Sequence, residues 1–156
     1  MTDPHLFAAL DIVRQTFADM RECIAGLPNE ALNWKPAGDD SNSAAVLAIH
    51  SLHSTRSWLC IATLEPPPYR DRESEFRTAA SDGSEVLTEF DEIASDCLAL
   101  LEPSRAIDWS SMRQWQSQPN PTDTAAWALI HAVEHLREHL GQIQLTRQLW
   151  EQTHYA

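Results

Sequence analysis

One stripe of apolar residues at the start of the chain limits the structures that it can form. The spacings within the stripe alternate between four and three residues, which places its members on one face of an α-helix of about six turns. Asp3 as N-cap and Pro4 in the first turn predict its start, and Gly26 and Pro28 predict its end. The stripe consists of Leu6, Leu10, Val13, Phe17, Met20, Ile24 and Leu27. A long helix with one apolar face packs against other helices, so we expect a helical bundle.

Three further helices are expected from apolar spacing, capping residues and prolines. The second is capped by Asn42 or Ser43 and runs to about Leu64, the third starts near Ser84 and ends at Pro103, and the fourth is capped by Thr122 or Asp123 and runs to about Gln152. The polar stretches 69–82 and 104–121 are long connections; the first could form a lid, and Trp109 and Trp115 indicate that the second packs on the bundle. The sequence therefore predicts an all-α four-helix bundle in one domain, residues 1–156, with long connections between helices 2–3 and 3–4.

The charge of the chain excludes two classes of partner. It has 23 acidic residues against 11 lysines and arginines, and its net charge is −12. No cluster of basic residues offers a surface for phosphates, and the acidic field repels nucleic acid and anionic membranes alike. No segment approaches the length of a membrane span. We therefore expect neither nucleic acid nor a membrane as a partner.

The N-terminus and the cysteines indicate a cytoplasmic protein. The first residues, MTDPHLFAAL, lack the basic and apolar regions of a signal peptide. Cys23, Cys60 and Cys97 are odd in number and widely spaced, which argues against a disulfide framework or a CxxC motif. We expect these cysteines to be small apolar residues of the core in a reducing compartment.

Histidines recur every fourth residue in the segment HAVEHLREHLGQ, at His131, His135 and His139. Residues four apart on a helix are separated by about 6 Å along its axis, so neighbouring members could share one metal ion. His131 and His139 are about 12 Å apart along the axis, too far for one ion held at about 2 Å from each nitrogen. His135 belongs to either pair.

A third ligand must come from elsewhere, and the second helix offers His50 and His53 in AIHSLHSTRSWL. Bundle helices pack about 8–10 Å apart, so imidazoles on facing helices can reach one ion. Three histidine ligands leave a coordination position open for water or substrate, as in catalytic sites. The alternative is a polar helix that is rich in histidine and binds no metal.

The segments HAVEH and HLREH also match the H-x-x-E-H pattern of inverted zinc proteases, in which the glutamate is the general base. That fold needs another ligand well downstream, and only 17 residues follow His139. We therefore disfavour a protease. Glu134 and Glu138 are better explained as solvated charges, or as acceptors that orient an imidazole.

The segments AAVLAIHSLHSTRSWL and HAVEHLREHLGQIQLTRQLW together resemble the DinB-like (DNA-damage-inducible) superfamily, which includes bacillithiol and mycothiol S-transferases. Members of that family place one ligand histidine midway along the second helix, ahead of an arginine and an aromatic residue. They place an H-x-x-x-H pair just before Gly-Gln in the fourth. In this chain the corresponding ligands are His50, His135 and His139. The resemblance thus prefers the pair 135 and 139, and it leaves His53 and His131 as pocket-lining or orienting candidates.

Two positions depart from the family pattern. Thr55 stands where many members have a glutamate, and Leu140 follows His139 where many have an arginine before Gly-Gln. These differences concern substrate contacts more than the metal.

The resemblance also implies an activity. A divalent transition metal, with zinc or nickel favoured, would activate a low-molecular-weight thiol for S-transfer to a small-molecule substrate, and the protein would be a homodimer. Two alternatives stay open at this point: a metal-dependent hydrolase that uses the same three histidines, and a non-catalytic dimeric stress protein that binds metal or a small ligand.

Overall fold

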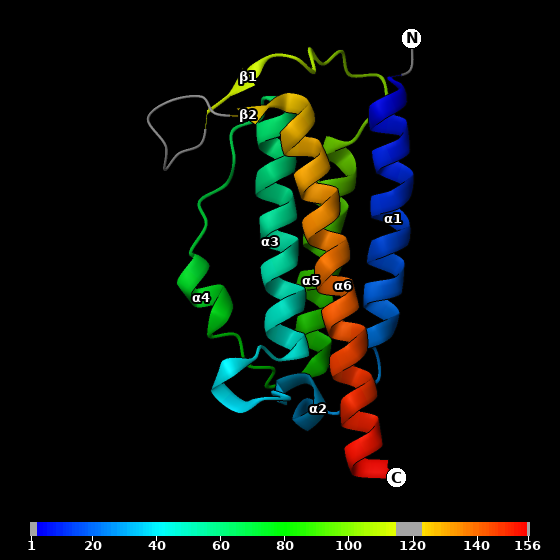
Figure 1. The fold of residues 1–156 in the computed structure, drawn as a ribbon, viewed down its shortest axis with the longest axis vertical. Helices are drawn as coiled ribbons and strands as arrows, with labels where there is room; N and C mark the ends of the chain where they lie inside the picture. Colours follow the sequence, from blue (N-terminus) through cyan, green and yellow to red (C-terminus); the bar gives the residue numbers. More distant parts are fainter. Residues whose placement is uncertain (1–2, 115–122, 156) are drawn as a thin grey trace.

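Four long helices form an elongated bundle in a computed structural model that describes residues 3–114 and 123–155 (Figure 1). They are α1 (Pro4–Ile24), α3 (Ala44–Thr63), α5 (Gly83–Leu100) and α6 (Ala125–Tyr155). The smaller elements are α2 (Asn29–Asn33), the 3-10 helix η1 (Gly38–Asp40), α4 (Arg72–Phe76), and the antiparallel strands β1 (Met112–Arg113) and β2 (Asp123–Thr124). The all-α prediction with two long connections is confirmed.

The helix boundaries follow local capping chemistry. Asp3 accepts hydrogen bonds from the backbone of the first turn of α1, and the Ser43 hydroxyl caps α3. The α1 helix ends at Ile24, before Leu27, because Gly26 adopts a left-handed conformation (φ 76°). Leu64 is the left-handed C-cap of α3, two residues before the first proline of the triplet.

The start of α6 differs from the prediction. Asp123 does not cap the helix because it pairs with Arg113 in the two-stranded sheet. The hydroxyl of Thr124 accepts instead from the backbone N–H of Trp127 at 3.1 Å. The other predicted cap, Thr122, lies outside the described residues. At its far end α6 reaches Tyr155, three residues beyond the predicted Gln152.

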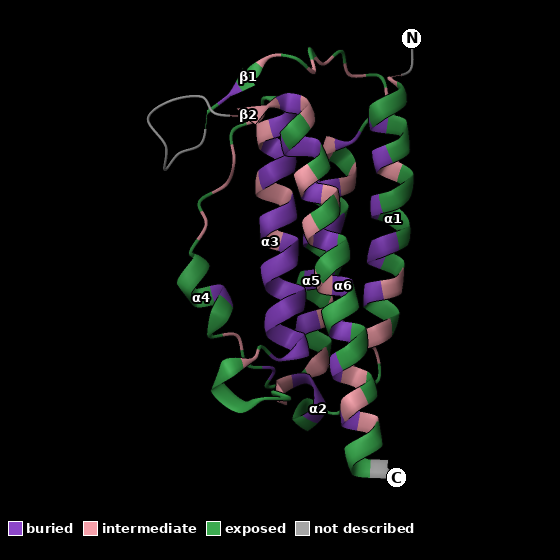
Figure 2. Ribbon diagram, viewed as in Figure 1, coloured by how far each residue is buried: buried purple, intermediate pink, exposed green. Residues whose placement is uncertain are grey.

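The α3 helix is the centre of the bundle and is buried along almost its whole length (Figure 2). It packs along α6 and α5, and α1 packs against the same two helices. The apolar stripe of α1 supplies core residues such as Phe17, whose ring meets the edge of Phe90 at a centroid distance of 5.9 Å. A polar side chain on the buried face of α3 therefore needs a partner within the protein.

The described parts of both long connections contact the bundle. The connection between α3 and α5 carries α4 beside α3 (Figure 1). In the connection before α6, the indole N–H of Trp109 donates to Asp3 at 2.8 Å, which fastens the chain to the start of α1 as predicted. Trp115, the other tryptophan considered there, lies outside the described residues.

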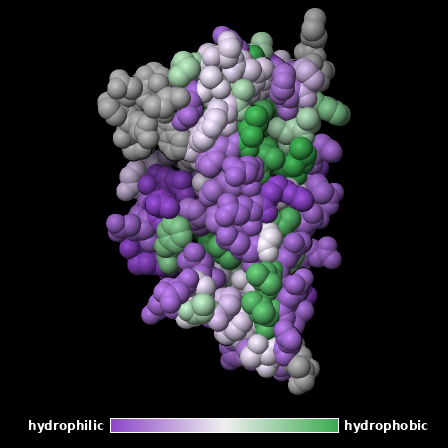
Figure 3. Space-filling view, in the orientation of Figure 1, coloured by the Kyte–Doolittle hydropathy of each residue, from purple (hydrophilic) through white to green (hydrophobic). Residues whose placement is uncertain are grey.

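The surface in Figure 3 is mainly hydrophilic, with apolar side chains gathered near the border between α6 and α1. A shallow hollow of about 310 Å³ lies at this border, and its lining includes Ile12 and Ile130. Among the described residues, no helix has both the length and the apolar character that a membrane crossing requires.

Candidate metal centre

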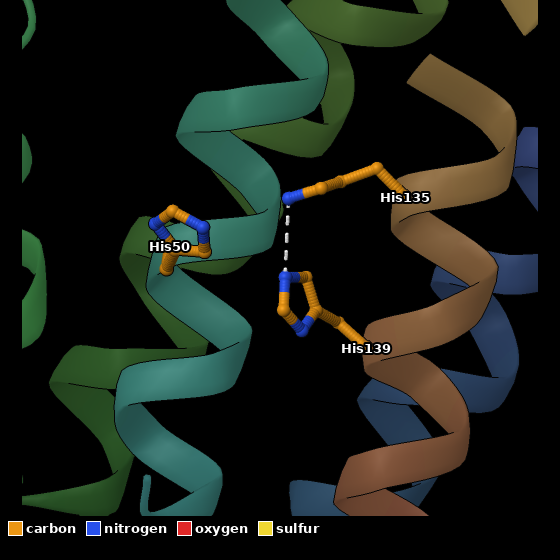
Figure 4. A group of neighbouring side chains, drawn as sticks. All are labelled: His50, His135 and His139. Carbon is orange, nitrogen blue, oxygen red and sulfur yellow. Dashed lines mark hydrogen bonds between the residues drawn. The ribbon is translucent and has the colours of Figure 1, made fainter. Parts of the chain in front are cut away.

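The three histidines selected from the sequence converge in space. His50 comes from the middle of α3, and His135 and His139 project from successive turns of α6 toward it (Figure 4). One nitrogen from each ring lies within 4.8 Å of the others, and the ring centroids are 4.4–5.4 Å apart. The fold therefore brings His50, His135 and His139 into one group that could hold a metal ion.

The spacing of the α6 pair suits ligation. The Nε2 atoms of His135 and His139 are 3.2 Å apart. Two nitrogens bound tetrahedrally to one ion at 2.0–2.1 Å would be about 3.3 Å apart, so the two rings need only a small adjustment. Without an ion, this contact is a hydrogen bond in which one Nε2 atom carries a proton and the other accepts it. A metal ion bound by both Nε2 atoms would replace that proton.

The orientation of the His139 ring is set by Gln142. Its side-chain oxygen accepts from Nδ1 of His139 at 2.8 Å, while its side-chain nitrogen donates to Glu138 at 3.2 Å. The second bond fixes which end of the amide faces the imidazole. With the proton on Nδ1, the Nε2 lone pair of His139 points at the group's centre.

A buried carboxylate on α4 orients His50. Glu75 lies 2.9 Å from Nδ1 of His50, and Arg70 holds the same carboxylate with two bonds of 2.6 and 2.8 Å. Nη2 of Arg70 is also 3.3 Å from Nδ1 of His50, but both atoms are donors once Nδ1 carries the proton. The shorter contact to Glu75 decides the tautomer, which leaves Nε2 of His50 free for a cation, as in carboxylate–histidine–zinc arrangements.

The charges of these groups follow from their surroundings. Burial alone would raise the pKa of Glu75, but the hydrogen bonds from His50 and Arg70 and the charge of Arg70 outweigh it and lower that pKa to about 2. Burial, reinforced by the charges of the other histidines and Arg70, lowers the pKa of His135 to about 3. Burial also lowers the pKa of His139. Neutral imidazole is the form that binds metal, so the lowered pKa values of His135 and His139 favour a cation near neutral pH.

His135 lacks the support that the other two rings have. Its Nδ1 is buried and has no hydrogen-bond partner within the described residues. Its orientation therefore depends on packing and on whatever binds its other nitrogen.

The metal-free protein is expected to lose stability as the pH falls from about 6.5 toward 3. The pKa of the His135 imidazole is near 6.5 when unperturbed and about 3 in the folded chain. Between these pH values the imidazole is therefore protonated in the unfolded chain and neutral in the folded one, which favours unfolding. Glu75 acts in the same direction, because its pKa is about 2 in the folded chain against 4.5 when unperturbed, so its contribution is lost below pH 4.5. Urea unfolding at pH 7, 5 and 4 measures the loss. A His135→Gln variant should show a weaker pH dependence between pH 7 and 5, and an unchanged dependence would contradict this account.

A cavity of about 550 Å³ opens beside the group. We call it the histidine cavity; residues that line it include His50, Trp58, Ile61, Arg72, His131 and His135. A small molecule in this cavity would reach the rings of His50 and His135.

The two remaining histidine candidates, His131 and His53, lie in different surroundings. His131 lines the histidine cavity, with its Nδ1 3.3 Å from Glu134 and its ring stacked on Trp127 at 4.7 Å. His53 instead turns toward α5, where its Nε2 lies 3.2 Å from Glu89. His131 is thus a pocket-lining residue, and His53 is not part of this site.

The glutamates of the H-x-x-E-H pattern do not face the group. Both Glu134 and Glu138 are exposed, and neither lines the histidine cavity. Glu138 contributes indirectly, since it holds Gln142 against His139. This matches the prediction of solvated or orienting carboxylates.

Sequence reasoning missed Glu75 and Arg70. They lie in the connection assigned as a long loop or lid, 25 and 20 residues beyond His50. In the segment RESEF, Glu73 and Glu75 have the same residue type and similar neighbours, and no sequence signal separates them. Only the packing of α4 on α3 buries one and exposes the other.

Comparisons with known proteins agree with the helical fold. Residues 12–143 match the family model of the DinB superfamily. The fold is similar to a crystal structure described as that of "the conserved protein of locus from Enterococcus faecalis", with a TM-score of 0.74, 13% sequence identity, and coverage of 96% of this chain and 98% of that one. At this identity the likeness concerns the fold alone. A search of curated proteins gives no match.

Proposed function

The chain belongs to the DinB superfamily, and from this premise we propose that it binds one divalent transition-metal ion through His50, His135 and His139. The observation that carries the proposal is the convergence of three ring nitrogens within 4.8 Å. Glu75 and Gln142 support it, because each engages Nδ1 of a ligand ring and leaves Nε2 to the ion. An all-imidazole donor set suits zinc or nickel better than magnesium or calcium.

We propose further that the ion serves thiol S-transfer. A divalent ion in such a site lowers the pKa of a thiol bound to it, so that the thiolate form is available as a nucleophile near neutral pH. The protein's own residues have separate tasks. Trp58 and Ile61 provide an apolar wall for the substrate. His131, held by Glu134, accepts the proton that the thiol releases.

An assay with 1-chloro-2,4-dinitrobenzene tests the activity. The thiolate sulfur forms a bond to the ring carbon, the carbon–chlorine bond breaks, and chloride leaves. We expect zinc- or nickel-loaded protein to accelerate this reaction with one member of a panel of cysteine, glutathione, bacillithiol and mycothiol. The acceleration should be lost in His139→Ala and kept in His53→Ala, the matched histidine one turn from His50.

Other outcomes separate the alternatives. Turnover of an ester without any thiol, with the same dependence on His139, would replace the transferase with a hydrolase. Bound metal with no turnover across both screens would leave a binding protein. Thiol transfer that persists in His139→Ala would refute the proposed role of the ion.

Replacing Glu75 with glutamine is expected to weaken zinc binding about 10- to 100-fold, as losses of such orienting carboxylates typically do. The amide keeps the shape but no longer fixes the Nδ1 proton of His50 by charge. Competition with a chromophoric chelator measures the affinity. Glu73→Gln is the matched control on the same helix, because Glu73 is exposed and pairs with Arg77 at 3.5 Å. Equal affinities for the two variants would contradict the role of Glu75.

A further inference from the structure

We propose that the histidine cavity selects small organic carboxylates with an apolar body, and that Arg72 binds the carboxylate. The inference deepens the proposed function, because it assigns a ligand class to the same cavity. It stands on the charge of the cavity lining and on the contacts of two arginines.

The charge of this cavity is opposite to that of the protein as a whole. The chain has a net charge of −12, yet the described residues that line the histidine cavity include two arginines and no aspartate or glutamate. Four other surface hollows are each lined by at least one carboxylate. These carboxylates include Asp19 in the first hollow, Asp96 in the second, Glu89 in the third and Glu134 in the fourth. The absence of carboxylates from the described lining makes this cavity favourable to an anion.

The two arginines differ in how many of their N–H donors are free to bind a ligand. Arg70 donates hydrogen bonds from Nε and Nη2 to the buried carboxylate of Glu75. Arg72 makes no ion pair or hydrogen bond to the described part of the chain; its guanidinium lies over the ring of Phe76, 5.2 Å from the centroid. Stacking on an aromatic face leaves the N–H groups at the edge of the guanidinium free for a planar, bidentate acceptor.

The position of Arg72 ties the anion site to the histidines. Phe76, over which Arg72 lies, packs its ring against that of His50 at a centroid distance of 4.5 Å. Arg72 and His50 both line the histidine cavity. A ligand that holds its carboxylate at Arg72 can therefore extend its other end toward the rings of His50 and His135.

The other residues that line the cavity favour a ligand with an apolar body. Trp58, Ile61, Pro67 and Pro68 give the cavity apolar surfaces. Such surfaces bind an aliphatic or aromatic body, while one well-placed charged group fixes its direction. A carboxylate suits the guanidinium because two parallel N–H···O bonds can form.

Binding of 1-naphthylacetate and its neutral analogue 1-naphthylacetamide to the metal-free protein tests the proposal by calorimetry. We expect the acid to bind about tenfold more tightly than the amide, the lower end for a charge-assisted pair at an exposed arginine. Arg72→Gln should reduce this preference to about twofold or less, and Arg72→Lys should keep part of it. Arg77→Gln is the matched control, because Arg77 follows the same short helix and pairs with Glu73.

Equal binding of acid and amide by the unaltered protein, or a preference that survives in Arg72→Gln, would overturn the proposal. A preference seen only after zinc is added would overturn it too, because the ion and not Arg72 would then hold the carboxylate. Since the measurement uses metal-free protein, failure of the metal proposal leaves its result unaffected. Conversely, loss of the acid preference says nothing against metal binding by the histidines.

Discussion

Replacing His139 with alanine is expected to weaken zinc binding by about 100-fold or more. The loss should exceed the 10- to 100-fold effect of removing a group that only orients a ligand, because the ligand itself is removed. The remaining pair comes from two different helices and cannot close a site alone. Chelator competition on untagged protein measures the change, since a histidine tag would supply its own ligands.

His53→Ala is the matched control for this variant. His53 lies on α3 three residues from His50, but its ring meets Glu89 and takes no part in the converging group. Its affinity should stay within about twofold of the unaltered protein. A His139→Ala protein that binds zinc as tightly as His53→Ala would exclude His139 as a ligand.

Removal of the metal is expected to lower the melting temperature by about 5–11 °C. An ion held by His50, His135 and His139 would join α3 to α6, so it would bind the folded chain and not the unfolded one. At a free zinc concentration 100 times the Kd this linkage contributes about 2.7 kcal/mol, and each kcal/mol shifts the midpoint of a chain of this size by about 2–4 °C. Calorimetry with zinc and with excess chelator measures the difference.

The same chelator should leave the melting temperature of His139→Ala unchanged. This control separates specific binding from weak association of zinc with the acidic surface. A chelator effect of equal size in both proteins would mean that the ion stabilises the fold from some other place.

Much of the fold could be predicted because it depends on local rules. The stripe from Leu6 to Ile24 needs only helical spacing, and the prolines after Leu64 need only the loss of a backbone donor. The errors lie where tertiary contacts compete with local preference. Asp123 belongs to a residue type that favours the N-cap position, but its backbone pairs with Arg113 in the two-stranded sheet. The α6 helix therefore begins at Ala125.

The site was predictable only in part, for a similar reason. Helical periodicity places His135 and His139 on one face, and the family resemblance selects His50 as their partner across the bundle. Glu75 could not be found in this way, because it reaches His50 through a connection whose path depends on packing. The cationic lining of the histidine cavity is hidden from the sequence too, since the chain as a whole is acidic.

The central claim is that imidazoles from α3 and α6 hold one ion between them. X-ray absorption on untagged protein, with elemental analysis of the same sample, tests it most directly. We expect one zinc or nickel ion per chain, with nitrogen neighbours at about 2.0–2.1 Å for zinc and the imidazole scattering pattern. Protein that carries no such ion even after incubation with zinc or nickel, or an ion with sulfur neighbours at about 2.3 Å, would contradict it.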